Sequence, residues 1–156
     1  MSDLLIVLLP PLPGEQWSRR ETAAELAAYN FQIKLISELP AETIDGDLDL
    51  AGAWVAHCAL EMAQKADRSP ALLVAQGGAG RMLAALGFSQ RASRRRVVGY
   101  VVVDGELPKA DVQDWPDAPV TYIGDRESHL ADLRGWEVLP NDDLGARLRE
   151  LAAASV

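Results

Sequence analysis

Runs of consecutive apolar residues alternate along the chain with segments whose apolar residues recur at helical spacing. The clearest runs are Leu4 to Leu9 and Val97 to Val103. Continuous apolar runs of this length are typical of strands buried on both faces of a parallel sheet. About six strands are expected in all, since four shorter strand-like segments lie at Phe31 to Ile36, Leu72 to Ala75, Val120 to Ile123 and Trp136 to Leu139.

Helices are expected between these strands, over about residues 17–29, 50–66, 81–93 and 144–151. Ser18, followed by Glu21 three residues later, predicts a capping box, and Asp142 and Asp143 predict a cap for the last helix. The second helix carries one apolar stripe, made of Leu50, Trp54, Cys58 and Met62. Alternating strands and helices predict a three-layer α/β domain with a mainly parallel sheet and helices on both faces. No linker or repeat divides residues 1–156, so one domain is expected.

Composition and charge narrow the possible partners. The chain has 156 residues, 49% of them apolar, which suits one domain with a sizeable core. It carries 15 Lys and Arg against 23 Asp and Glu, a net charge of -8, so neither nucleic acid nor an anionic membrane is an expected partner. The one basic run, Arg94 to Arg96, is expected to be a solvated helix end.

The expected compartment is the cytoplasm. A single cysteine excludes an internal disulfide, and its place in the apolar stripe predicts a buried, inert thiol. The run from Leu4 to Leu9 lacks the basic flank and the length of a signal peptide. No cofactor is expected, and no metal is expected because no histidine pair or carboxylate cluster has metal-ligand spacing. Within the acidic loop from Pro40 to Asp49, the segment from Asp45 to Asp49 resembles a calcium loop without its closing glutamate.

The most informative segment runs from Leu72 to Gly80. It predicts a buried strand, a tight glycine turn and then a helix. This layout resembles the nucleophile elbow of α/β-hydrolases, G-x-S-x-G, in which a strained turn projects a serine from the carboxyl edge of the sheet. The corresponding residues are Ala75-Gln76-Gly77-Gly78-Ala79, so Gly77 stands where the serine belongs.

The order of the other segments is similar to a short α/β-hydrolase without a lid. Pro10 to Gly14 looks like the loop that holds the oxyanion-hole donor, with Trp17 where the family often has an aromatic residue. Val97 to Asp104 resembles the strand that ends in an acidic loop, and Gly124 to Glu127 resembles the segment that carries the triad acid. The resemblance spans nearly the whole chain and implies the α/β-hydrolase-like fold.

Two of the three catalytic parts that the resemblance implies are absent from their positions. Gly77 replaces the nucleophile, and the stretch from Leu139 to Asp143, where the histidine should follow the last strand, contains none. Acyl transfer needs an activated nucleophile beside a base. The weak candidates for catalysis are therefore His129 with Glu127 or Asp125, while His57 is expected to be a solvated surface residue.

Three functions stay open, and a non-catalytic protein that binds a small molecule or a protein partner is favoured. The glycine turn then supplies a site for a small anion or acyl-type ligand, made of Gln76, Gly77, Gly78, Gly80 and Arg81. The alternative is an esterase- or thioesterase-type hydrolase with relocated catalytic residues.

The third possibility is a nucleotide-binding protein. In it Gly78-Ala79-Gly80 would supply a G-x-G turn, and Asp104 would bind a ribose hydroxyl. A homodimer is also expected, because without a lid an apolar edge near Trp17, Leu107 and Trp115 would be exposed.

Overall fold

The computed structural model describes residues 4–39, 50–64, 69–110 and 112–155. Six strands form one sheet in the order β2-β1-β3-β4-β5-β6, and all neighbouring pairs are parallel. The strands are β1 (Leu5–Leu8), β2 (Gln32–Leu35), β3 (Ala71–Gln76), β4 (Val97–Val103), β5 (Val120–Ile123) and β6 (Glu137–Leu139). The predicted six-stranded parallel sheet is confirmed.

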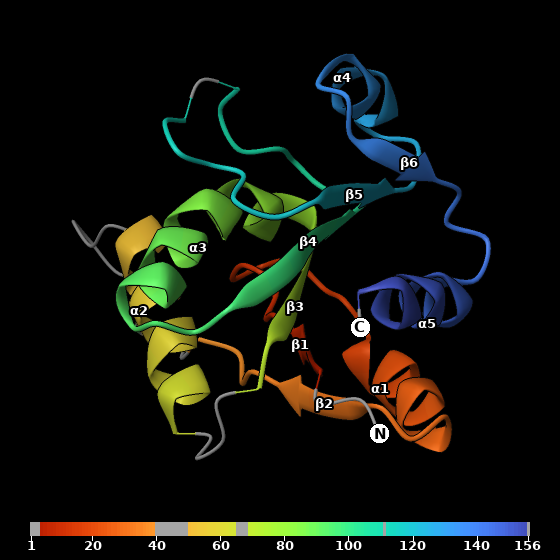
Figure 1. Ribbon diagram of the computed structural model, residues 1–156, viewed down its shortest axis with the longest axis horizontal. Coiled ribbons are helices and arrows are strands. Elements are labelled where there is room, and N and C mark those ends of the chain that lie inside the picture. Colours follow the sequence, from red (N-terminus) through yellow and green to blue (C-terminus); the bar gives the residue numbers. More distant parts are fainter. Residues whose placement is uncertain (1–3, 40–49, 65–68, 111, 156) are drawn as a thin grey trace.

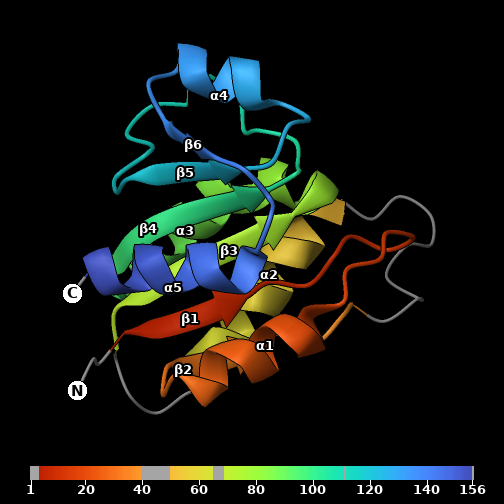
Figure 2. The same ribbon diagram turned by 90° about the vertical axis from the view of Figure 1, so that its right-hand side faces the viewer.

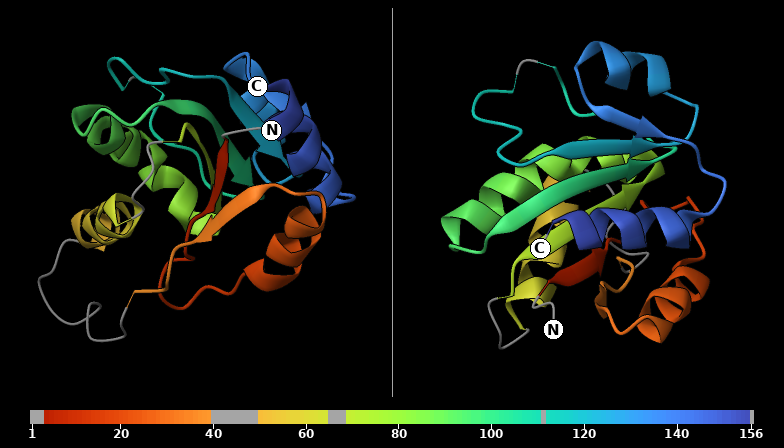
Figure 3. Two further views of the ribbon diagram at one scale, coloured as in Figure 1. Left: turned by 60° about the horizontal axis from the view of Figure 1, so that its bottom comes forward. Right: turned by 45° about the vertical axis from the view of Figure 1, so that its right-hand side comes forward.

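Helices cover both faces of this sheet (Figure 1). They are α1 (Arg19–Ala28), α2 (Leu50–Ala63), α3 (Leu83–Ala92), α4 (Ser128–Leu133) and α5 (Leu144–Ala154). A 3-10 helix, η2 (Gly77–Met82), leads from β3 directly into α3. Figure 2 shows α1 and α5 side by side in front of the sheet, and Figure 3 shows α2 and α3 on the opposite side.

Alternation of side chains in the central strands divides the core in two. Val7 and Leu73 point to the α2 and α3 face, whereas Ile6 and Leu72 point to the α1 and α5 face. All four residues of β1 are buried, as expected of a parallel strand covered on both sides. The continuous apolar runs in the sequence therefore reflect helices on both faces.

The predicted stripe on α2 faces the core. Trp54, Cys58 and Met62 are buried, and the indole of Trp54 donates a hydrogen bond to the carbonyl of Pro10 at 3.1 Å. Cys58 is a free thiol inside the core, so the expected burial is confirmed, and burial raises the pKa of this thiol.

One expectation about local structure is wrong, one helix was not predicted, and one expectation lies outside the described residues. The Ser18 side chain makes no capping hydrogen bond to α1, so the predicted capping box is wrong, whereas Asp143 does cap α5 by accepting from Ala146 N–H. The six-residue helix α4 has no counterpart among the predicted helices. The acidic loop from Pro40 to Asp49, with its calcium-like pattern, lies outside the described residues.

The chain order places a topological switch point at the carboxyl edge of the sheet. From β1 the chain passes to β2 on one side and then crosses to β3 on the other. Loops that leave neighbouring strands in opposite directions open a crevice at such a switch point, where open α/β sheets bind ligands. The segment after β1 and the glycine turn after β3 meet there.

Candidate functional site

The turn after β3 has the backbone geometry of an elbow. Gly77 has φ +63°, a left-handed backbone conformation that residues other than glycine adopt only with strain. A Cβ on Gly80 would collide with the carbonyl oxygen of Glu106, and a Cβ on Gly105 would lie 2.6 Å from the Gly77 carbonyl oxygen. The glycines thus let the ends of β3 and β4 approach closely, and the turn persists without a nucleophile.

The carboxylate of Glu15 lies over this turn. Gly78 N–H donates to both oxygens of Glu15, at 2.9 Å each. A Cβ on Gly77 would lie 2.5 Å from Oε2 of Glu15, so the carboxylate occupies the space into which a side chain at Gly77 would project. In an α/β-hydrolase the residue after the nucleophile gives its N–H to the oxyanion. The Glu15 carboxylate therefore accepts from the Gly78 amide, which corresponds to the amide that binds the oxyanion in a hydrolase.

Charged side chains border the turn on its other side. Arg81 pairs with Glu106 through its Nε atom at 2.5 Å, and Arg126 approaches the second oxygen of Glu106 at 3.6 Å. All three side chains are at least one-third exposed, at 53%, 36% and 54% for Arg81, Glu106 and Arg126. Gln76, at the end of β3, is half-buried, and its Oε1 has no hydrogen-bond partner among the described residues.

Asp104 joins the loops that follow the last three strands. Its Oδ1 accepts from Asp125 N–H at 3.0 Å, and its Oδ2 accepts from the amide of Asn141 at 2.9 Å. Both carboxylate oxygens of Asp104 therefore accept hydrogen bonds from this chain. A nucleotide-binding protein would need a free acceptor at this position for the ribose hydroxyl. Together with the packing of Gly80 against Glu106, this geometry argues against a nucleotide-binding role for Gly78-Ala79-Gly80.

The three weak catalytic candidates do not form a relay. Asp125 is exposed, and Glu127 donates its N–H to the hydroxyl of Tyr122 at 2.8 Å. His129 is exposed on α4, and its side chain makes no hydrogen bond or ion pair within the described part of the chain. Nothing orients the imidazole towards Glu127 or towards the turn.

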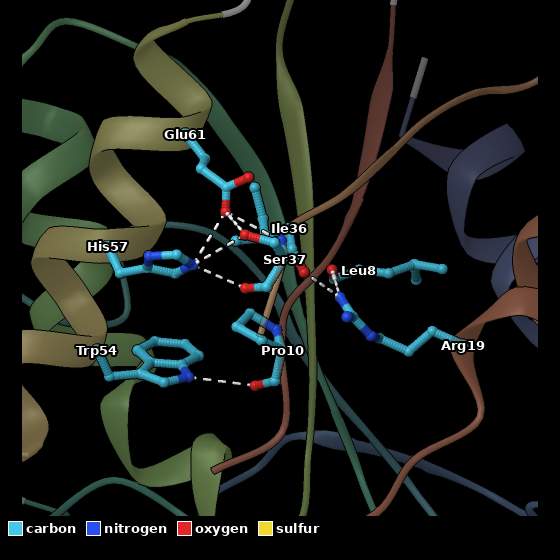
Figure 4. Close-up of polar contacts among 8 residues, drawn as sticks. All are labelled: Leu8, Pro10, Arg19, Ile36, Ser37, Trp54, His57 and Glu61. Atoms are coloured by element: carbon cyan, nitrogen blue, oxygen red, sulfur yellow. Dashed lines mark hydrogen bonds and ion pairs between the residues drawn. The ribbon is translucent and has the colours of Figure 1, made fainter. Parts of the chain in front are cut away.

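A polar cluster that the sequence interpretation missed joins β2 to α2 (Figure 4). Glu61 accepts from Ser37 N–H at 2.9 Å and from the Ser37 hydroxyl at 2.6 Å, and His57 Nε2 lies 2.9 Å from the same carboxylate oxygen. His57 Nε2 also lies 2.7 Å from the Ser37 carbonyl oxygen. His57 is half-buried and paired, so its expected place as a solvated surface residue is wrong.

The hydrogen bonds of this cluster determine which ring nitrogen of His57 carries a proton. A carbonyl oxygen only accepts, so His57 Nε2 must carry a proton and donate it. That nitrogen cannot then take the proton of the Ser37 hydroxyl, 3.3 Å away. In this arrangement the cluster connects α2 to the end of β2. On the opposite side of β2, Arg19 donates to the carbonyls of Leu8 and Ile36, and burial lowers the pKa of its guanidinium.

The premise of the expected dimer surface needs correction. Trp115 is only 6% exposed, because it packs edge-on against Tyr100 and Trp136 with ring centroids 5.1 and 5.9 Å away. Trp17 and Leu107 are half-buried. The apolar edge is smaller than expected, and the homodimer stays a prediction.

Comparison with known proteins supports the fold alone. No protein-family model matches the chain, and no curated protein matches it. A solved structure from Xanthomonas campestris pv. campestris, described as that of a candidate hydrolase of the alpha/beta superfamily, matches with a TM-score of 0.57 and 14% identity. The match covers 97% of this chain and 95% of the other. The α/β fold with its parallel sheet thus resembles an α/β-hydrolase.

Two further observations concern membrane-spanning helices and metal ligands. No helix in the described segments has the length and apolar character needed to cross a membrane. Within those segments, no three potential metal ligands of the His, Cys, Asp and Glu types gather at one place.

Replacing Gly77 with valine should destabilise the protein by more than about 2 kcal/mol, since strain at positive φ costs about 1 to 3 kcal/mol and the new side chain meets Glu15. Urea unfolding of Gly77→Val measures the loss. The Glu15→Ala background should recover the crowding part and leave the strain. A loss under about 0.5 kcal/mol would mean that Gly77 does not occupy a strained turn.

Replacing Glu61 with alanine should lower the free energy of unfolding by about 1 to 3 kcal/mol, because Ser37 N–H, the Ser37 hydroxyl and His57 lose one shared acceptor. Glu21 is an exposed glutamate on α1 that makes no such contact with the described part of the chain, so Glu21→Ala is the control and should change stability by less than about 0.5 kcal/mol. Equal unfolding midpoints for the two variants would refute this role for Glu61.

Proposed function

We propose that this chain is a non-catalytic, α/β-hydrolase-like protein that binds a small ligand at the carboxyl edge of its sheet. The observation that carries the proposal is the Glu15 carboxylate on Gly78 N–H. A carboxylate there supports an anionic ligand for the turn, because the corresponding amide in a hydrolase receives the oxyanion of an acyl intermediate.

The chemistry of the turn argues against acyl transfer at this site. Gly77 has no side chain to attack a carbonyl, and Glu15 fills the space in front of it. The loop after β6 offers Asn141, whose amide is bound to Asp104, where the relay needs a base. A hydrolase of the Ser-His-acid type requires a nucleophile, a base within hydrogen-bond reach and an open oxyanion site. The glycine turn meets none of these three requirements.

The exposure of Glu15 makes exchange with a ligand feasible. Glu15 is exposed and reaches Gly78 from a segment 63 residues earlier in the chain. A ligand carboxylate or phosphate can replace it with a bond of the same kind, and Arg81 and Arg126 stand nearby to add positive charge. The expected small anion or acyl-type ligand is therefore the class that we favour.

A second candidate function, a hydrolase with relocated residues, is favoured by one observation. Ser37, His57 and Glu61 bring a hydroxyl, an imidazole and a carboxylate together. However, Glu61 contacts the same ring nitrogen that faces Ser37, whereas a triad carboxylate holds the opposite nitrogen. The pairing of His129 with Glu127 has no comparable contact among the described residues.

Purified protein should not turn over p-nitrophenyl acetate or butyrate above background, because no nucleophile faces the elbow. Labelling with a fluorophosphonate probe, read by intact mass, tests the same point for any activated serine. Saturable turnover would contradict the proposal. Loss of that turnover in Ser37→Ala would assign the activity to the cluster of Ser37, His57 and Glu61. Loss in His129→Ala would assign the activity to His129.

Removing the Glu15 side chain should open the turn to added anions. We expect acetate and phosphate to shift the amide NMR signals of residues 76–81 at lower concentration in Glu15→Ala than in the unchanged protein. NAD should give no additional shift at Asp104, because both oxygens of that side chain are engaged. The control is Glu21→Ala, which removes an exposed glutamate elsewhere. Shifts at Asp104 with NAD alone would favour a nucleotide-binding protein instead.

A further inference from the structure

An apolar groove lies next to the elbow, between α3 and the loop that joins β4 to β5. Its volume is about 350 Å³, within the range of small-molecule pockets. It is lined by Arg81, Ala84, Ala85, Phe88, Leu107, Pro108, Lys109 and Val112. Figure 1 shows this loop passing over α3 on the way to β5. Because Arg81 follows the glycine turn directly, the groove continues the candidate ligand site.

One helix face forms the floor of the groove. Arg81, Ala84, Ala85 and Phe88 recur at three- and four-residue intervals, so they lie along one side of η2 and α3. The seven steps from Arg81 to Phe88, at a rise of about 1.5 Å each, make this strip about 10 Å long. The two alanines leave space between the larger side chains at its ends. The floor therefore fits an elongated apolar group better than a globular one.

The positive charges of the groove belong to Arg81 and Lys109. Arg81 is shared with Glu106, whereas Lys109 is exposed and makes no ion pair within the described residues. The guanidinium of Arg91 lies 5.5 Å from the ring of Phe88, so it marks the aromatic end of the strip. In a chain of net charge -8, attraction for an anion must come from such local cations.

We propose that this groove binds an aliphatic carboxylate. The chain lies along Ala84 and Ala85 towards Phe88, and the carboxylate lies near Arg81 and Lys109. Burial of the chain against Leu107, Pro108 and Val112 supplies most of the affinity, and the two cations select the head group. The inference rests on the proposed ligand-binding function, which it narrows to one class of ligand.

Isothermal titration with octanoate, 1-octanol and acetate tests the two halves of this site. We expect octanoate to bind more tightly than either of the others, since octanol lacks the charge and acetate lacks the chain. In Ala85→Trp the indole fills the groove, and we expect octanoate affinity to fall at least 10-fold. The matched control is Ala24→Trp, an exposed alanine on α1 across the sheet, which should leave affinity within about 2-fold.

The head-group half is tested by Lys109→Glu. We expect this variant to weaken octanoate binding up to about 5-fold, as for an exposed ion pair, and to leave octanol binding unchanged. Equal affinity for octanoate and octanol would overturn the carboxylate assignment. Equal octanoate affinity in Ala85→Trp and Ala24→Trp, or no octanoate binding at all, would overturn the groove.

The proposed function and this inference fail in different ways. Turnover of p-nitrophenyl octanoate would defeat the non-catalytic function, and the groove would still be supported if Ala85→Trp raised the KM of that reaction. Absence of both turnover and octanoate binding would defeat the groove alone and leave the glycine turn as the ligand site.

Discussion

The hydrogen bond from Gly78 N–H to Glu15 connects the two loops on which the candidate site depends. The elbow leaves backbone N–H groups at the start of a helix without partners inside the helix. In a hydrolase the substrate satisfies one of them during the reaction, and here Glu15 does so in the resting protein. A hydrogen bond to a charged group contributes about 1.5 to 3 kcal/mol. The contact therefore stabilises the packing of these two loops, and it also occupies the Gly78 amide.

The elbow persists for reasons of packing. Gly80 lies against the Glu106 carbonyl and Gly105 lies against the Gly77 backbone, so β3 and β4 can end close together only if these positions lack side chains. Asp104 then connects the loops after β4, β5 and β6 through Asp125 and Asn141. These contacts keep the carboxyl edge in order whether or not any reaction takes place there.

The sheet could be predicted from the sequence because its signal is local. Continuous apolar runs such as Leu4 to Leu9 are a direct result of burial on both faces, and the glycines after Leu72 to Gln76 mark the turn. The capping box expected at Ser18 was wrong because the Ser18 side chain makes no hydrogen bond to the first turn of α1, which sequence spacing alone does not reveal. The exposure expected of Trp115 was wrong because its aromatic neighbours are distant in the sequence: Tyr100 lies within β4 and Trp136 lies directly before β6.

The candidate site was predicted only in part, because its contacts are distant in the sequence. The glycines of the turn were identified, but Glu15 lies 63 residues before Gly78 and belongs to no motif. Likewise, the spacing of His57 and Glu61 on one helix face was visible, whereas their contact with Ser37 depends on how α2 packs beside β2. The partners of charged loop residues depend on which strand ends the sheet brings together, so sequence spacing does not predict them.

Amide hydrogen exchange at Gly78, followed by NMR, tests most directly whether Glu15 occupies the elbow. The account predicts slow exchange in the unchanged protein and clearly faster exchange in Glu15→Ala, while amides in the centre of β3, such as that of Leu73, keep their rates. Equal Gly78 exchange rates in the two proteins would contradict it, because the amide would then have no partner in Glu15 to lose.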